Sequence, residues 1–158
     1  MRVSRQWRDL KHRKWHGFGH DTGRDPSNGG LALFCPTCPQ PGVNIPDNWK
    51  NSQNPWLYTR SETLDGNFEI NKLKTKNPWD DVSLSDGTAY MVEDIPYQAH
   101  LKNAKEIKQK STCNQHRAAT EGNLNRQNLI YTGISGSACA RHGCWIPHSV
   151  VDFQKGER

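Results

Sequence analysis

The sequence predicts a small, irregular α+β fold that depends on metal ligands for part of its stability, and three observations lead to this expectation. The chain has 158 residues, and only 33% of them are apolar, well below the roughly 45–50% of typical domains. Five cysteines are present, and four of them fall in short-spaced pairs with another cysteine or with a histidine. Helical and extended patterns are short and are separated by segments rich in Gly, Pro and Asn. Bound metal would offset the shortage of core, because ligand binding contributes directly to the free energy of folding.

The first element predicted is a helix over residues 1–16, since apolar positions recur there at helical spacing. No Pro or Gly interrupts this stretch, and Gly17 and Gly19 then end it. A loop is expected over 20–30, followed by a short apolar run at 31–34. That run leads into the turn CPTCPQPG, whose prolines restrict the backbone and suit a metal-binding knuckle.

The rest of the chain alternates irregular and extended segments. Residues 44–56 are expected to be irregular with Trp49 and Trp56 as anchors, and 77–87 read as a turn-rich insert. Residues 58–73 predict either a strand pair or one long strand around Asp65-Gly66-Asn67. Further strands are predicted over 88–95, 128–134 and 149–153, and a helix from Pro96 to about Lys110.

The clearest motif is a repeated Cys-x-x-His pair, in which two residues separate the thiol from the imidazole. The pattern occurs as CNQH and again as CARH, so that the candidate ligands are Cys113, His116, Cys139 and His142. Two turns that each supply two such ligands are what a tetrahedral zinc site requires. The 22 residues between the pairs contain several Gly and Asn and are pliable enough to close the site. Cys144 follows two residues after His142 and is a spare candidate, so the set of four stays open.

The net charge of +5 is concentrated at the N-terminus. Residues 1–24 carry seven basic and two acidic side chains, so they hold the whole excess. Cationic side chains interleaved with Trp7 and Trp15 suit a nucleic-acid backbone, because they displace condensed counterions. A solvated helix face that keeps the protein soluble is an equal alternative on charge alone. The candidate nucleic-acid contacts are Arg2, Arg5, Arg8, Lys11, Arg13 and Lys14.

Several strings together resemble the KDZ (Kyakuja–Dileera–Zisupton) transposase proteins of fungi, at the junction between their CxC2-like cysteine cluster and the transposase region. The resemblance covers almost the whole chain, and the combination of CPTCPQPG, DGNF and CARHG makes it specific. It implies two parts, with 1–46 as the end of the cysteine cluster and 47–158 as the N-terminal part of an RNase H-like transposase region. The expected fold is therefore a zinc-stabilised fragment that contains the first strands of that RNase H-like core.

The resemblance also implies site residues and metals. Asp65 in LDGNF corresponds to the first catalytic aspartate of the family, whose nuclease core holds two divalent ions, Mg²⁺ or Mn²⁺. Asp65-Gly66 is also a common turn dipeptide, which is the reading that the residues favour without the resemblance. Cys35 and Cys38 would close the cysteine cluster as a DNA- or protein-binding zinc module. Asp152 is a second acidic residue near this core, and the CNQH and CARH pairs would form a separate structural zinc knuckle.

Where the chain departs from the family, the expected activity changes. Family members continue beyond the position of Arg158, so the later acidic motifs are missing, as are the earlier cysteines of the cluster. The sequence therefore predicts a truncated, transposase-derived protein that binds zinc structurally, contacts DNA weakly and is inactive in transposition, with Mg²⁺ or Mn²⁺ relevant only in an intact family member. Two alternatives are a stand-alone zinc-dependent DNA- or protein-binding module and a small metalloenzyme with one open zinc position.

The expected surroundings follow from these observations. No apolar stretch approaches the roughly 20 residues that cross a bilayer, and no secretory signal opens the sequence, so no membrane partner is predicted. A reducing compartment is expected for the cysteines, and the resemblance implies the nucleus. The oligomeric state is left open.

Overall fold

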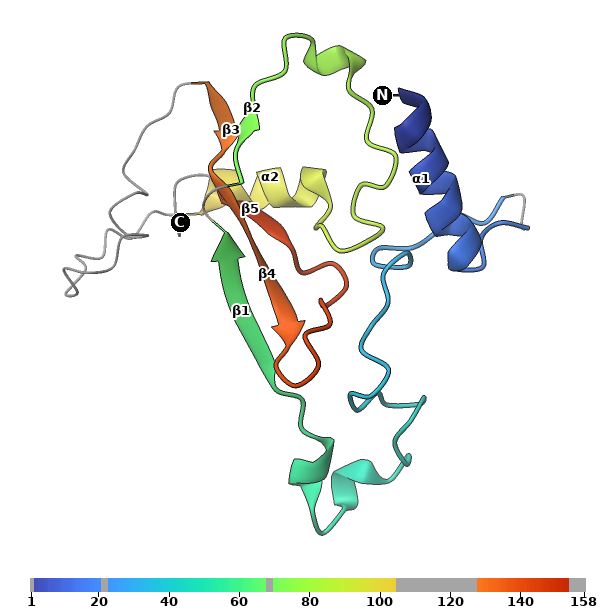
Figure 1. The fold of residues 1–158 in the computed structure, drawn as a ribbon. Coiled ribbons are helices and arrows are strands. Elements are labelled where there is room, and N and C mark those ends of the chain that lie inside the picture. Colours follow the sequence, from blue (N-terminus) through green and yellow to red (C-terminus); the bar gives the residue numbers. More distant parts are fainter. Residues whose placement is uncertain (1, 21–22, 68–69, 105–127, 154–158) are drawn as a thin grey trace, which may run out of the picture.

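The computed structural model describes residues 2–20, 23–67, 70–104 and 128–153. Within these ranges it is a mixed helical and sheet structure, as the composition predicted (Figure 1). Helix α1, Arg2–Trp15, lies to one side of the sheets, and an arm that contains the 3-10 turns Trp49–Asn51 and Pro55–Tyr58 projects away from them. A third 3-10 turn, Pro78–Asp80, precedes helix α2, Asp94–Asn103.

Two antiparallel sheets pair strands from residues 62–73 with strands from residues 129–153. Strands β1 (Glu62–Asn67), β4 (Gly133–Cys139) and β5 (Val151–Phe153) form one sheet in the order β1-β4-β5. Strands β2 (Lys72–Leu73) and β3 (Leu129–Tyr131) form a second, two-stranded sheet. The register pairs Glu62 with Cys139 and Asp65 with Gly136, so β1 follows the full length of β4. In the described part of the chain β1 has a strand neighbour on one side only.

The helix predicted over 1–16 is confirmed, because α1 ends at Trp15 and Gly17 then takes a left-handed backbone with φ +85°. Its apolar side chains do not enter a core, however. Val3, Trp7 and Leu10 are all more than half exposed. The helical spacing was therefore correct for the local structure, but it does not mark a buried face.

The Asp65-Gly66 dipeptide does not form a hairpin turn. Both residues lie within β1, and β1 and β2 pair with later strands rather than with each other. An alanine Cβ at Gly66 would stand 2.6 Å from Cε2 of Phe153, so the close approach of that ring accounts for a glycine here. A close cross-strand contact, which local turn preference does not reveal, places this glycine in a strand.

The strand predicted over 88–95 is wrong. Only Met91 makes an isolated bridge, to Val150, and α2 begins at Asp94 within the predicted strand. The first amides of α2 are satisfied from outside the helix, since the Glu93 N–H donates to His148 Nε2 at 3.1 Å and the Asp94 N–H to Asp86 Oδ1 at 3.0 Å. Pro96 falls in the first turn, where proline is tolerated. The helix is described to Asn103, and 105–110 of the predicted helix lie outside the described residues.

The strand predicted over 128–134 is divided between β3 and β4 at Thr132, and β4 continues to Cys139, beyond the predicted end. The predicted strand at 149–153 is present as the shorter β5. Neither described helix is long and apolar enough to cross a bilayer.

Few side chains are buried in the described part of the chain. The buried apolar residues are Leu31, Cys35, Cys38, Cys139 and Val150, so three of the five are cysteines. Ser135 is buried as well, and its hydroxyl donates to the Asp65 carbonyl at 2.9 Å. The centre of this fold is thus made largely of thiols, which directs attention to what they could bind.

Candidate metal centre

The first half of the centre is the CPTC knuckle. Cys35 and Cys38 are 2% and 5% exposed, and the Cys38 N–H donates to the Cys35 carbonyl at 3.3 Å. Asn44 stabilises the turn, because its Nδ2 donates to the carbonyls of Pro36 and Cys38 at 3.1 and 2.9 Å. Gln40 Nε2 adds a bond to the Cys35 carbonyl at 3.0 Å. Side-chain amides therefore substitute for regular secondary structure in positioning the two sulfurs.

The second half is the CARHGC turn at the end of β4. The Gly143 N–H donates to the Cys139 carbonyl and the Cys139 N–H to the Cys144 carbonyl, each at 2.8 Å. Gly143 has φ +67°, a left-handed conformation that glycine adopts without steric cost. This closed turn directs Cys139 Sγ and His142 Nδ1 to the same side as the knuckle.

The start of β1 brings the two halves together. The Ala140 N–H donates to the Ser61 carbonyl at 2.9 Å, which extends the β1–β4 pairing into the CARH turn. The guanidinium of Arg60 lies 4.9 Å from the ring centroid of Phe34, next to the knuckle. The strand pairing therefore delivers the turn to a knuckle that lies about a hundred residues earlier in the chain.

Four donor atoms converge at this point, and all lie within 4.8 Å of one another: Cys35 Sγ, Cys38 Sγ, Cys139 Sγ and His142 Nδ1. The closest pair is Cys38 and Cys139, with sulfurs 3.0 Å apart, and His142 Nδ1 is 3.3 Å from Cys35 Sγ. His142 Nδ1 also lies 3.4 Å from Cys139 Sγ and 3.9 Å from Cys38 Sγ. Zn–S bonds of about 2.3 Å and Zn–N bonds of about 2.0–2.1 Å in a tetrahedron set donors roughly 3.3–3.8 Å apart. The observed separations bracket that range.

The protonation chemistry of the group also fits a cation. A hydrogen bond with the Thr37 hydroxyl lowers the pKa of Cys35 to about 6. The hydrogen bond with Cys139 raises the pKa of Cys38 to about 12 and lowers that of Cys139, and a hydrogen bond to Cys139 raises the pKa of His142. Three thiols this close cannot all ionise without a positive charge among them, and a metal ion supplies that charge while displacing the protons. Three thiols and one imidazole could hold a metal ion, and the set is consistent with structural zinc.

The grouping of the ligands differs from the one that the sequence indicated. CARH was expected to close a site with CNQH, and CPTC was assigned to a separate cluster, whereas the structure joins CPTC to CARH. Cys113 and His116 lie outside the described residues. The spacing within CPTC and within CARH singled out residues that could hold a metal ion. Which pairs meet is decided by the pairing of β1 with β4, and local spacing carries no information on that.

Cys144 is beside the group without belonging to it. Its side chain is half-buried and packs against the three buried cysteines, and its Sγ lies 3.9 Å from the His142 carbonyl. A hydrogen bond to Cys35 raises the pKa of the Cys144 thiol. Because Cys35 and Cys38 complete a set of four, the open three-ligand arrangement of a catalytic zinc is not what these described residues form.

The carboxylates are arranged differently from the thiols. Asp65 is exposed on β1, where its Oδ1 accepts the Gly66 N–H at 2.7 Å. Asp152 on β5 shares the same face of the sheet according to the strand register, and burial raises its pKa. Its Oδ1 is buried without a partner in the described structure, while the Tyr97 hydroxyl donates to the Asp152 carbonyl. Among the described residues, neither aspartate belongs to a convergent group of three or more ligand side chains.

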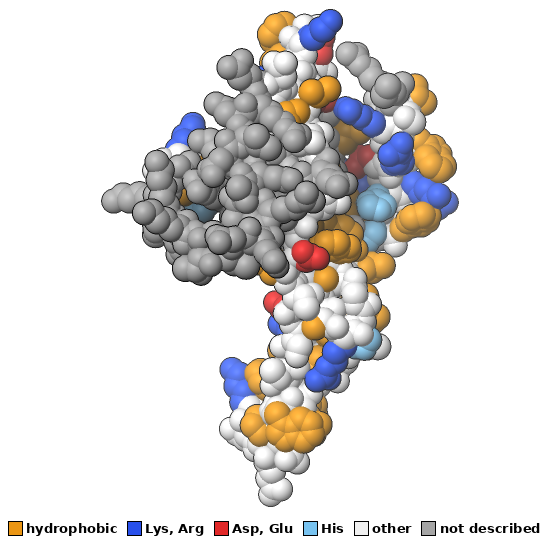
Figure 2. All heavy atoms as spheres, turned by 60° about the vertical axis from the view of Figure 1, so that its left-hand side comes forward, with side chains coloured by type: hydrophobic (Ala, Val, Ile, Leu, Met, Phe, Trp, Pro, Cys, Tyr) orange, Lys and Arg blue, Asp and Glu red, His pale blue; other side chains and the backbone are white. Residues whose placement is uncertain are grey.

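The basic residues singled out in the sequence follow α1. Arg5 pairs with Asp81 at 3.0 Å, and Arg13 bridges Asp9 and Asp25 at 3.1 and 3.3 Å. These ion pairs tie α1 to the segment that follows it and to the loop after the third 3-10 turn. Arg8, Lys11 and Lys14 form no ion pair with another described residue, and the side chain of Arg2 is outside the description. On the flank that carries α1, basic and apolar side chains are interspersed (Figure 2).

Comparison with known proteins gave one match. No curated protein and no solved structure matched this chain. The family model of the Kyakuja-Dileera-Zisupton (KDZ) transposases matches residues 58–158, which contain both sheets, Asp65 and the CARH turn. Because that match covers well over half of the sequence, the chain belongs to the KDZ transposase family.

Proposed function

We propose that this chain is a zinc-organised, DNA-binding part of KDZ transposition that does not cleave DNA by itself. The observation that carries the proposal is the convergence of CPTC with CARH, because one ligand pair lies inside the family match and the other precedes it. A shared ion would hold the segment before residue 58 against the family region.

The zinc in this proposal is structural. Cys35, Cys38 and Cys139 are buried and His142 completes the set, so four protein ligands leave no position for water or substrate. Zinc bound by these residues would supply folding free energy in place of a large apolar core. We expect the purified chain to contain one zinc, measured by mass spectrometry, and Cys139→Ser or His142→Ala to lose it. Unchanged metal content in both variants would remove the site.

The sheet β1-β4-β5 would be the beginning of an RNase H-like core. Support comes from the family match and from the position of Asp65 on β1, whose second edge carries no strand in the described part. Two-metal phosphodiester chemistry needs several carboxylates around the ions. Among the residues that the structure describes, Asp65 gathers no such group, so we expect no strand cleavage with Mg²⁺ or Mn²⁺. Nicking that Asp65→Ala abolishes would overturn this part of the proposal.

DNA contact is proposed for α1, and a nuclear location follows from that role. Its support is the concentration of the net positive charge in the first 24 residues and the exposure of the helix. Such binding would be indifferent to sequence and would weaken steeply as salt is added, because the release of condensed counterions from DNA then becomes less favourable. We expect a gel retardation assay with duplex DNA to show this salt dependence and to lose the complex when residues 1–16 are deleted. Equal retardation by the deleted chain would refute it.

The alternative is a stand-alone zinc-dependent binding module. The closed donor set favours it, since the site needs no further carboxylate to be complete. The two functions differ in their dependence on Asp65. If the chain contributes to a nuclease core, Asp65→Asn should abolish DNA cleavage by a KDZ transposase that contains it. If the chain is a binding module, Asp65→Asn should leave its zinc content and its binding unchanged.

A further inference from the structure

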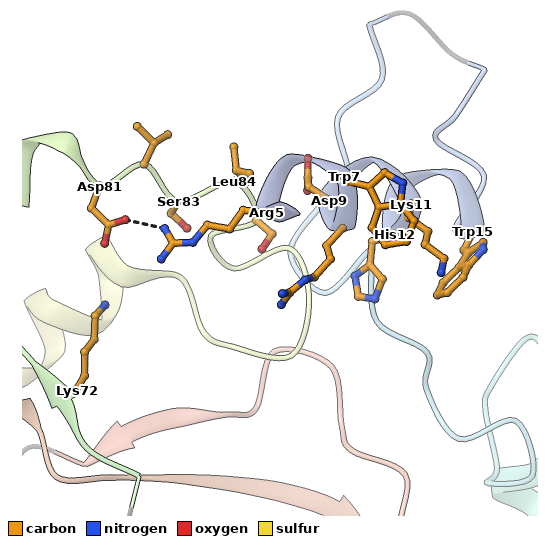
Figure 3. A pocket seen from close by; sticks show the side chains of 13 residues that line it. Arg5, Trp7, Asp9, Lys11, His12, Trp15, Lys72, Asp81, Ser83 and Leu84 are labelled. Carbon is orange, nitrogen blue, oxygen red and sulfur yellow. Dashed lines mark hydrogen bonds and ion pairs between the residues drawn. The ribbon is translucent and has the colours of Figure 1, made fainter. Parts of the chain in front are cut away.

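A pocket lies between α1 and the loop formed by residues 81–85, with Lys72 of β2 at its far end (Figure 3). Its volume is ≈ 660 Å³, which is within the range of about 300–1,000 Å³ for small-molecule sites. None of the residues that line it belongs to the group of candidate metal ligands. The wall that α1 contributes carries exposed aromatic side chains together with basic ones.

That wall carries an aromatic ladder. Trp7, Lys11 and Trp15 are spaced by four residues and therefore share one face of the helix, as Figure 3 shows. The Lys11 ammonium lies 4.7 Å from the Trp7 ring centroid and 4.5 Å from that of Trp15. The two indoles are nevertheless 60% and 65% exposed. Two large rings that lie about two helical turns apart, with the Lys11 ammonium between them and without a place in a core, are suited to contact flat aromatic groups.

The charge of the lining is also unbalanced. Asp81 and Asp9 line the pocket but are already paired, with Arg5 and with Arg13. The other basic lining residues, Arg8, Lys11 and Lys72, form no ion pair within the described structure. The pocket therefore combines cationic groups that can bind phosphate with aromatic faces on which a base can stack.

We propose that this pocket binds unpaired nucleotides of a single strand of nucleic acid. Successive bases would stack on the exposed indoles of Trp7 and Trp15, one base on each ring, and the phosphates of the strand would lie against Arg8 and Lys72. Aromatic rings with cationic neighbours are how proteins hold single strands without reading their sequence. In a duplex the bases are stacked on one another and cannot reach the indoles, so the preference for a single strand depends on the rings and not on the charge.

This inference rests on the proposed role of α1 in DNA contact and makes it more specific. An acidic peptide or an anionic membrane would satisfy the cations but would give the indole faces no stacking partner. The distinction can be tested by removing the rings while leaving every charge in place.

The experiment uses the full zinc-loaded chain and fluorescence anisotropy with a labelled thymidine oligomer, a duplex of the same length and inorganic polyphosphate. Replacing both indoles (Trp7→Ala with Trp15→Ala) should weaken oligomer binding roughly fivefold or more, since stacking contributes about 1–3 kcal/mol per base. Duplex and polyphosphate binding should be nearly unchanged. The matched control is Trp56→Ala, which removes an equally exposed indole on the arm and should have no effect.

A second variant separates stacking from folding. Trp7→Phe with Trp15→Phe keeps an aromatic face at each position and should retain part of the single-strand preference, with zinc content and circular dichroism unchanged. If the double alanine variant binds the oligomer as tightly as the parent and still binds the duplex, the proposed stacking in the pocket is refuted. The proposed contact of α1 with DNA would then remain. If the chain does not bind the duplex but binds the oligomer in a way that depends on the two indoles, only the proposed contact of α1 with duplex DNA is refuted. Polyglutamate or anionic vesicles bound as tightly as the oligomer, with the same dependence on the rings, would also overturn the inference.

Discussion

Helix α1 is formed by fourteen consecutive residues and is mostly exposed, whereas the metal centre takes two ligands from each of two distant turns and buries three of them. The helix follows from local spacing alone, and two of its ion pairs, Arg5 with Asp81 and Arg13 with Asp25, reach segments outside it. The centre requires the sheet to form before its donors can meet. A substitution in α1 should therefore change binding more than folding, and a substitution around the centre should do the reverse.

The largest effect is expected at the metal ligands. Cys38→Ser removes a sulfur that is 5% exposed and 3.0 Å from Cys139 Sγ. Structural zinc supplies about 10–16 kcal/mol in small zinc domains, comparable to the whole stability of about 5–15 kcal/mol of a typical domain. We expect this variant to lose its metal and its cooperative thermal unfolding transition, followed by near-ultraviolet circular dichroism. Cys144→Ser is the matched control and should keep both.

A chain that melts like the parent after Cys38→Ser would show that the centre does not stabilise the fold. It would also remove the contrast with α1, because neither region would then contribute much to stability.

A smaller loss of stability is expected from a substitution at Gly136 of β4. An alanine Cβ at Gly136 would lie 2.7 Å from Cζ3 of Trp145 and 3.0 Å from Cγ2 of Val150. Overpacking of this kind costs about 1–3 kcal/mol. Gly136→Ala should therefore lower the free energy of unfolding by that amount in denaturant titrations of the zinc-loaded protein. Leu64→Ala, at a side chain that is 76% exposed, should stay within about 0.5 kcal/mol of the parent.

The ion pairs of α1 should matter less still. Arg5 and Asp81 are 61% and 39% exposed, and pairs of this kind contribute about 0–1 kcal/mol. A double-mutant cycle of Arg5→Ala and Asp81→Ala should give a coupling energy in that range that fades as salt is added. The less exposed pair of Arg13 and Asp9 is the internal comparison and should couple more strongly. A coupling above 2 kcal/mol for the exposed pair would mean that α1 is part of the folding unit.

No change is expected when the first Cys-x-x-His pair, CNQH, is substituted. Cys35, Cys38, Cys139 and His142 already form a set of four residues that could hold a metal ion, and four is the ligand number of a structural zinc. The combined variant Cys113→Ser with His116→Ala should keep one zinc per chain, with Cys35→Ser as the positive control that loses it. A drop in metal content in the combined variant would restore the pairing that the sequence alone indicated.

The sequence predicted the local elements better than their partners. Residues 2–15 are helical and β1, β3 and β5 fall inside predicted extended segments, because side-chain spacing expresses these preferences directly. The segment at 88–95 was predicted as a strand, yet its end is helical. The reason is that the side chains of Asp86 and His148 cap the amides there. A cap supplied by residue 148 is a contact that no window around residue 94 contains.

The candidate site divides in the same way. CPTC and CARH each place two candidate ligands on one turn, and the spacing within each pair is enough to predict this. Its partner pair lies 101 residues away in the case of Cys38 and Cys139. Local sequence patterns do not show which distant pairs come together, so the two pairs were assigned to different sites.

The amino-acid sequence by itself determined the family, the ligand chemistry and the basic, aromatic character of the first helix, because each of these depends on residue type and short-range spacing. Tertiary structure alone decided which pairs of candidate ligands converge, that Asp65-Gly66 runs within a strand, and that the tryptophans of α1 border a pocket. These outcomes depend on which distant segments pair, and strand register sets that only when the whole chain has folded.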